Sequence, residues 1–237
     1  MSVAIPLVLV VLLAAVLVAV PRLGPWQAGR RCRAAARALI SDYGFASDTR
    51  TTQLSELSSL PPFHYGTRRQ VHDPVAGAFS GLPAEVFGYS CRENGTGHWY
   101  GVAVVRLGRV LPPLEVQHEP VFTSSRVRYT PAYPRRRTGA EDFDAAHRAS
   151  TPDDRLADAL LTPGLARTML AAPEPFDWRV EGGLLVVWRR DGWTDATALV
   201  DCCLTAVHAL APVLDLDPDA FDAPRSVQGT EPPGGTP

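Results

Sequence analysis

The chain has 237 residues, a formal net charge of −2 and 46% hydrophobic residues. Because nucleic-acid-binding domains usually carry a strong basic excess, this near-neutral chain predicts no nucleic-acid partner. All 23 basic residues are arginine. The lack of lysine excludes a Walker-type phosphate loop and any chemistry that needs a lysine, such as a pyridoxal phosphate Schiff base.

An uncharged apolar segment runs from Val3 to Val20. At about 1.5 Å per helical residue it spans roughly 27 Å, close to the hydrocarbon core of a bilayer. No basic residue precedes it, and cleavage after Ala19 would place the large Leu17 at the −3 position, so it lacks the features of a cleaved signal peptide. We therefore predict a transmembrane anchor over residues 1–21, with residues 3–20 in contact with the lipid bilayer.

The charges that flank this segment predict its direction. No basic side chain precedes it, whereas five arginines follow it within residues 22–37. They are Arg22, Arg30, Arg31, Arg33 and Arg37. The positive-inside rule then predicts a single-pass protein of the cell membrane with its globular domain in the cytoplasm. The same arginines would attract anionic lipid. An exported domain that an uncleaved signal anchors to the envelope is the alternative.

Composition divides the rest of the chain into three parts. Residues 22–62 are predicted to form a juxtamembrane helix, over 26–42, and a polar linker rich in Ser and Thr. Residues 63–221 are long enough for one globular domain with its own core. Residues 222–237 are rich in Pro and Gly, which predicts a disordered tail.

Short segments rich in Val, Tyr and Phe predict strands in the first half of the domain. They cover residues 69–72, 76–80, 84–92, 98–107 and 114–118. Glu93–Gly97, with the sequence ENGTG, is a strong hairpin signal, so the first four strands are predicted to form an antiparallel meander. Both faces of strand 98–107 are apolar, which favours a central position.

The second half predicts a strand over 143–149 and then two short helices. Thr151 and Thr162 each precede a proline, a pattern typical of a capped helix start. The second of these helices is expected to end near Ala171 and to bury Leu165, Met169 and Leu170.

A second hairpin and a last helix complete the predicted domain. Phe176, Trp178 and Val180 alternate with polar residues, and an apolar segment over 184–189 follows Gly182-Gly183, which predicts a hairpin with its turn at the two glycines. Thr194 is expected to cap a helix that ends near Ala211. Its buried face would hold Leu199, Cys202, Cys203, Ala206 and Leu210. These patterns together predict an α+β fold, a mostly antiparallel sheet covered by helices.

Cysteine and histidine supply the clearest candidate for chemistry. Cys91 and His98 flank the first hairpin and would be cross-strand neighbours, while His118-Glu119 is the nearest further pair of possible ligands. An enzyme, or a metal or thiol site, assembled from dispersed residues near Cys91, His98 and His118 is therefore an alternative interpretation. A strand cysteine packed in the core is the simpler one, so we assign no catalytic, cofactor-binding or metal-binding residue and no cofactor.

Two arginine clusters are candidates for contact with anionic lipid or with an unidentified protein partner. One is Arg30, Arg31 and Arg33 beside the anchor, and the other is Arg135, Arg136 and Arg137 in a predicted loop. A solvated surface explains both clusters as well.

The pattern of turn, cap and core residues also resembles a known group of proteins. The residues that carry the resemblance are Phe79–Tyr89, Leu111–Leu114, Phe143-Asp144, Leu160–Pro163 with Leu165 and Leu170, Trp178–Gly182 and Leu184–Trp188. They resemble an uncharacterised family of bacterial membrane-anchored proteins, a domain of unknown function common in actinobacteria. The resemblance implies a membrane tether and a shared fold over roughly 63–211, and it transfers no catalytic residue. The sequence thus predicts a non-enzymatic, single-pass membrane protein that presents an α+β domain for interaction or scaffolding.

Overall fold

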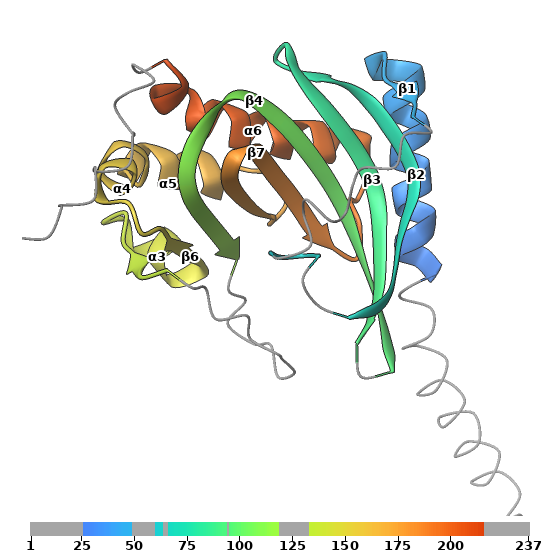
Figure 1. Cartoon of the computed structure of the whole chain (residues 1–237), viewed down its shortest axis with the longest axis horizontal. Coiled ribbons are helices and arrows are strands. Elements are labelled where there is room, and N and C mark those ends of the chain that lie inside the picture. Colours follow the sequence, from blue (N-terminus) through green and yellow to red (C-terminus); the bar gives the residue numbers. More distant parts are fainter. Residues whose placement is uncertain (1–25, 49–59, 64–65, 94, 119–132, 216–237) are drawn as a thin grey trace, which may run out of the picture.

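The computed structural model describes residues 26–48, 60–63, 66–93, 95–118 and 133–215. These residues form an α+β domain in which a seven-stranded antiparallel sheet packs against helices (Figure 1), so the predicted fold class is confirmed. The predicted anchor over 1–21 and the predicted tail over 222–237 lie outside the described residues.

The sheet is built around one long strand. In chain order the strands are β1 (Ala46–Ser47), β2 (Thr67–Phe79), β3 (Leu82–Glu93), β4 (Thr96–His118), β5 (Arg135–Arg136), β6 (His147–Ser150) and β7 (Asp177–Arg190). They are ordered β1-β2-β3-β4-β6-β5, and β7 also pairs with β4. The predicted central position of strand 98–107 is confirmed, because β3 flanks it on one side and β7 on the other.

The first hairpin forms where it was predicted. β3 and β4 pair in continuous register from Ala84–Val105 to Glu93–Thr96, and Gly95 in the turn has a positive φ of 82°. The strands are longer than predicted, however. Residues 69–72 and 76–79 belong to the single strand β2, which a bulge interrupts between His72 and Val75, and the predicted second strand ends one residue earlier than expected. The predicted strands 98–107 and 114–118 are likewise parts of one strand, β4.

The predicted second hairpin is wrong. Residues 177–190 form the one strand β7, and both of its halves pair with β4. Gly182 faces Leu111, at a point where the register shifts on either side, and has a φ of 58°. The glycine pair therefore forms an irregularity within the ladder, because β4 continues beside it and offers backbone partners to both halves.

The observed helices differ from the predicted elements in several of their boundaries. They are α3 (Glu141–Ala146), α4 (Asp154–Leu160), α5 (Pro163–Leu170) and α6 (Ala196–Leu214), besides a helix over residues 26–43 that confirms the first predicted helix. Residues 143–149 are not one strand, since α3 covers most of them and β6 begins at His147.

Two of the three predicted helix caps are displaced. Thr162 caps α5 as predicted, with its hydroxyl accepting from the Leu165 amide. Asp153 caps α4 in place of Thr151, whose buried hydroxyl donates to the Pro113 carbonyl at 2.7 Å. Asp195 caps α6 in place of Thr194, and Leu170, expected inside, is 46% exposed.

The sheet buries apolar side chains on both faces. On one face, the helix over 26–43 and helices α4, α5 and α6 enclose the main core, which includes Ala103 and Val105 of β4. The alternate residues Val102 and Val104 point to the other face, where they form a smaller cluster with Phe63 and parts of β3 and β7. All five predicted inner residues of α6 are buried, as expected.

α6 is the one helix among the described residues that is long and apolar enough to cross a membrane by length and composition. Nine of its residues are buried in the domain, including Leu199 and Leu210. Packing inside the domain accounts for this apolar composition.

Candidate functional site

The cysteine and histidine candidates do not form one site. Cys91 and His98 are cross-strand partners, as predicted, but His118 lies at the opposite end of β4. The ring of His118 packs edge-on against that of His147, with 5.2 Å between the ring centroids. His98 Nδ1 lies 3.2 Å from Nη2 of Arg190, and His98 Nε2 lies 3.7 Å from Oε2 of Glu93. Burial raises the pKa of the Cys91 thiol, which disfavours the thiolate that a nucleophile or metal ligand needs. In the described part of the chain no group of three His, Cys, Asp or Glu side chains is placed to hold a metal ion.

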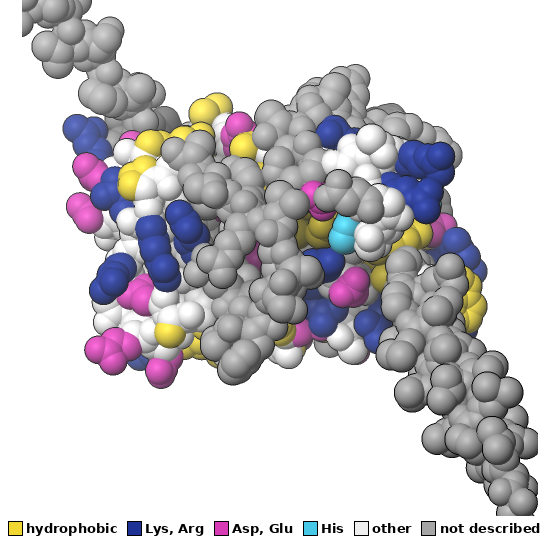
Figure 2. Space-filling view, turned by 90° about the horizontal axis from the view of Figure 1, so that it is seen from below, with side chains coloured by type: hydrophobic (Ala, Val, Ile, Leu, Met, Phe, Trp, Pro, Cys, Tyr) yellow, Lys and Arg dark blue, Asp and Glu magenta, His cyan; other side chains and the backbone are white. Residues whose placement is uncertain are grey.

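The arginines of the second cluster are partly used to hold the fold together. Arg135 donates to the backbone carbonyls of Asp144 at 2.6 Å and of His147 at 3.2 Å. Arg136 pairs with Asp154, at the start of α4, and donates to the Thr151 carbonyl. With Arg137 they line a hollow of about 700 Å³ whose other charged walls are acidic. Figure 2 shows arginine side chains at both ends of the face that it draws.

The helix over residues 26–43 presents a mixed basic and apolar stripe to solvent. Its inner face is buried against the sheet through Ala28, Cys32, Ala35, Ala36 and Leu39. Along its exposed side Trp26, Arg30, Arg33, Arg37 and Ile40 follow one another at alternating spacings of four and three residues. Such spacing aligns side chains along one side of a helix. We call these five residues the outer stripe.

The outer stripe is unusual in its exposed apolar side chains. Among the described residues five large hydrophobic side chains are exposed, and three of them lie on this helix: Trp26 at 58%, Ile40 at 40% and Tyr43 at 41%. The guanidinium of Arg30 lies 4.8 Å from the ring centroid of Trp26, a cation–π contact. A helix with one face fixed to its domain and the other both basic and apolar is typical of contact with an anionic membrane surface.

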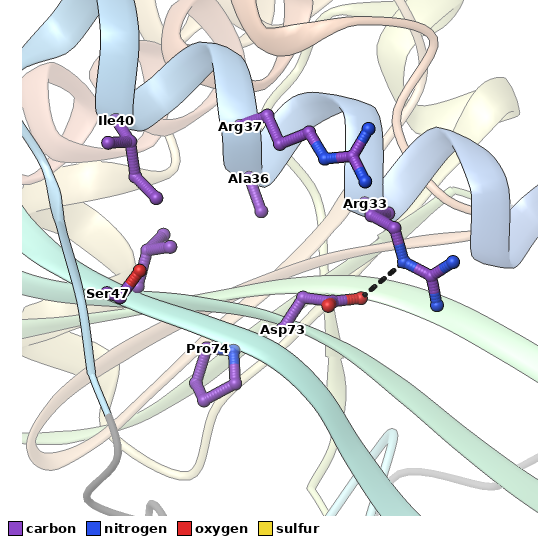
Figure 3. A pocket seen from close by; sticks show the side chains of 8 residues that line it. Arg33, Ala36, Arg37, Ile40, Ser47, Asp73 and Pro74 are labelled. Atoms are coloured by element: carbon purple, nitrogen blue, oxygen red, sulfur yellow. Dashed lines mark hydrogen bonds and ion pairs between the residues drawn. The ribbon is translucent and has the colours of Figure 1, made fainter.

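A groove lies between the outer stripe and the edge of the sheet. Its volume is about 410 Å³, and its walls are Arg33, Ala36, Arg37 and Ile40 from the helix and Ser47, Asp73, Pro74 and Val75 from β1 and β2. Figure 3 shows the helix side chains on one wall and Ser47, Asp73 and Pro74 on the other, with Arg33 reaching across. We call it the helix–strand groove.

One ion pair crosses this groove. Arg33 Nε lies 3.3 Å from Asp73 Oδ2, and the two side chains are 56% and 38% exposed. Arg37 pairs with no acidic residue in the described part of the chain. The charged groups of the lining, two arginines and one aspartate, therefore leave one positive charge unmatched.

The β2 bulge places Asp73 at the groove. Asp73 has a φ of 47° and lies inside the irregularity between His72 and Val75. Its neighbour His72 is held in the fold, with Nε2 2.8 Å from the Ser90 hydroxyl and its ring stacked on Trp99 at 4.4 Å. Bulges redirect side chains and are common beside functional sites. On the buried face of the helix, burial and then the Asp73 charge raise the pKa of Cys32 to about 11, so its thiol stays neutral.

Sequence reasoning found part of this site. Arg30 and Arg33 were candidates for contact, whereas Arg31 lies off the outer stripe on the side of the helix between stripe and buried face. Arg37 was noted only as a flanking charge, and Ile40, Ser47 and Asp73 were missed. The spacing of 26, 30, 33, 37 and 40 could have revealed the stripe, but the approach of β1 and β2 is a tertiary contact.

A buried polar cluster lies elsewhere, on the sheet face opposite the helices. Glu115 of β4 faces Arg179 of β7 and Ser150 of β6 in the register. Arg179 donates to the Pro61 carbonyl at 2.8 Å and pairs with Glu181, so it fastens residues 60–63 over the sheet. Burial raises the pKa of Glu115 to about 7, although Arg179 acts in the opposite direction. We interpret this cluster as a structural fastening.

Comparison with known proteins shows a shared fold. No family model matches the chain, and no curated protein matches it by sequence. It is similar to the crystal structure of the mycobacterial trehalose monomycolate transport factor A, TtfA, with a TM-score of 0.51 and 12% identity. The likeness covers 79% of this chain and 93% of that one. At this identity the chain resembles TtfA in its fold.

Proposed function

We propose that the chain is a membrane-anchored accessory domain without catalytic activity, whose outer stripe lies against an anionic membrane surface. The observation that carries the proposal is the stripe itself, which combines three arginines with Trp26 and Ile40 on the exposed side of the helix. Each arginine near such a surface contributes about 1 kcal/mol of attraction, and tryptophan favours the interface.

Two further observations support the proposal. The predicted anchor ends a few residues before Trp26, so the helix begins close to the predicted membrane boundary. The fold resembles that of TtfA, a transport factor, which is consistent with an accessory role in a transport process at the membrane.

A fluorescent probe on the helix tests the proposal in the full chain. The four cysteines are all buried, so Ala34→Cys, at an exposed helix position next to the stripe, provides one selective labelling site. In vesicles that contain phosphatidylglycerol, an environment-sensitive label there should shift to the blue relative to phosphatidylcholine vesicles. Salt should reverse the shift, because the attraction is electrostatic.

Two controls decide the interpretation. The same label at Val110→Cys, a 77% exposed position on β4, should show no shift. Replacing Arg30, Arg33 and Arg37 together by Gln should abolish the shift at position 34, while the same change at Arg135–Arg137 should leave it. Equal emission in the two kinds of vesicle would refute contact through the outer stripe.

A further inference from the structure

We propose that the helix–strand groove binds the phosphate of an anionic phospholipid headgroup, with Arg37 and Arg33 as its ligands and Asp73 as an internal competitor. The inference rests on the proposed function, since it requires the outer stripe to lie at the membrane surface. It adds a defined binding site and a charge that opposes binding.

The chemistry of the lining favours a phosphate. A guanidinium presents a planar set of donors that matches phosphate oxygens, and the groove holds two, from Arg33 and Arg37, one helical turn apart. Ser47 adds a hydroxyl on the opposite wall. The volume of about 410 Å³ lies within the range of small-ligand sites.

The apolar part of the lining favours a lipid as the source of that phosphate. Ile40 is 40% exposed at one end of the groove, and Ala36 and Pro74 extend the apolar wall. A free phosphate ion has no apolar part that could contact this surface, whereas the glycerol and first acyl carbons of a phospholipid would cover it. The groove also opens beside the outer stripe, so a headgroup that neutralises the stripe can reach it.

Asp73 competes because it already neutralises one of the two ligands. Its contact with Arg33 is a single one of 3.3 Å between half-exposed groups. Exposed pairs of this kind contribute little stability and exchange readily. A phosphate that displaces the carboxylate gains Arg33 but still meets a like charge, so the site binds more weakly than its two arginines alone would allow.

Because Asp73 competes with the phosphate, removing its charge should increase affinity, whereas damage to the site would decrease it. Asp73→Asn should tighten binding, because it removes the repulsive charge and releases Arg33. Asparagine also adopts the positive φ of 47° as readily as aspartate does, so the bulge should persist. A gain in affinity cannot arise from misfolding.

The experiment uses the full chain in phosphatidylcholine nanodiscs, labelled at Ala34→Cys and titrated with short-chain phosphatidylglycerol. Asp73→Asn should lower Kd about fivefold, and Arg37→Gln should raise it about fivefold, the effect of about 1 kcal/mol per charge. Asp42→Asn and Arg31→Gln make the same charge changes on exposed residues of the helix outside the groove, and should leave Kd unchanged.

Each alternative result overturns a defined part of the proposal. If Asp73→Asn and Asp42→Asn behave alike, the groove is not the site, although a blue shift in anionic vesicles would still support surface contact by the outer stripe. If inorganic phosphate at equal ionic strength binds as tightly as the lipid, the lipid source is wrong. If neither probe binds and no vesicle shift occurs, both proposals fail.

Discussion

Individual residues affect the stability of this protein mainly through the space that side chains have in the core and through buried charge. Gly101 on β4 shows the effect of space, because an added Cβ would lie 2.3 Å from Cδ1 of Trp193. Trp193 is 1% exposed, so it has little room to move. A sequence inspection marks Gly101 only as a strand glycine, since its neighbour Trp193 is 92 positions away.

Gly101→Ala should therefore destabilise the fold by about 1–3 kcal/mol, the usual effect of overpacking a core. The measurement is the free energy of unfolding in urea, followed by tryptophan fluorescence. Gly97→Ala is the matched control, because it lies on the same strand and an added Cβ there meets nothing within 4 Å. Equal losses in the two variants would contradict the packing argument.

Glu115 shows the effect of charge. Its pKa is raised from 4.5 to about 7, chiefly by burial. The folded state therefore binds this proton more tightly than the unfolded chain does. That contribution to stability is fully present below about pH 4.5 and is lost as the pH rises through about 7.

Glu115→Gln, which is neutral at every pH, should remove this dependence. Relative to the parent chain it should become more stabilising between pH 5 and pH 8, by on the order of 1–3 kcal/mol. Denaturant unfolding across that pH range measures the difference. His147, whose pKa burial lowers to about 4, is common to both proteins and its effect cancels. Asp177, whose pKa burial raises to about 7, does not cancel, because its charge repels that of Glu115; removing this repulsion stabilises the variant at high pH and so acts in the same direction. A constant difference would mean that Glu115 stays ionised throughout.

At the scale of elements, strand pairing overrides local turn signals. Gly182-Gly183 is a good hairpin sequence, yet β7 continues through it because β4 runs alongside, with pairs from Tyr100 to Val116. The glycines take up the register shift instead. Their roles differ, since Gly182 has a φ of 58° and Gly183 does not have a positive φ.

This difference predicts opposite responses to the same substitution. Gly182→Ala should cost about 1–2 kcal/mol of stability, the penalty of a left-handed conformation for an L-residue. Gly183→Ala should be neutral or slightly stabilising, because its added Cβ meets only the Arg109 carbonyl at 3.5 Å. Thermal unfolding of both variants tests this, and a larger loss at Gly183 would show that the bulge is wrongly placed.

At the scale of the whole molecule the proposed anchor makes a prediction about the side of the membrane on which the domain lies. The flanking arginines predict the cytoplasm. Val110→Cys places a 77% exposed thiol on a protein whose own thiols are buried. In intact cells an impermeant maleimide should leave it unlabelled, and permeabilisation should allow labelling. Labelling of intact cells would support the exported alternative and would move the search for lipid and partner to the envelope.

Local chemistry in the sequence was enough to determine much of this protein. The absence of lysine excludes whole classes of reaction. The ENGTG turn, the Thr162–Pro163 helix start, the helix over 26–42 and the apolar periodicity of α6 are predictions that the structure confirms. Each of these signals acts over a few residues, through turn geometry, capping or helical spacing.

Only the tertiary structure decided which surfaces meet. It showed that β7 is one strand, that Asp153 and Asp195 are the caps, and that the helix over 26–43 buries one face on the sheet and leaves the outer stripe free. It also brought Arg33 to Asp73, 40 positions apart, and so formed the groove. Contacts over such separations depend on strand register and on the packing of whole elements, which no short stretch of sequence encodes.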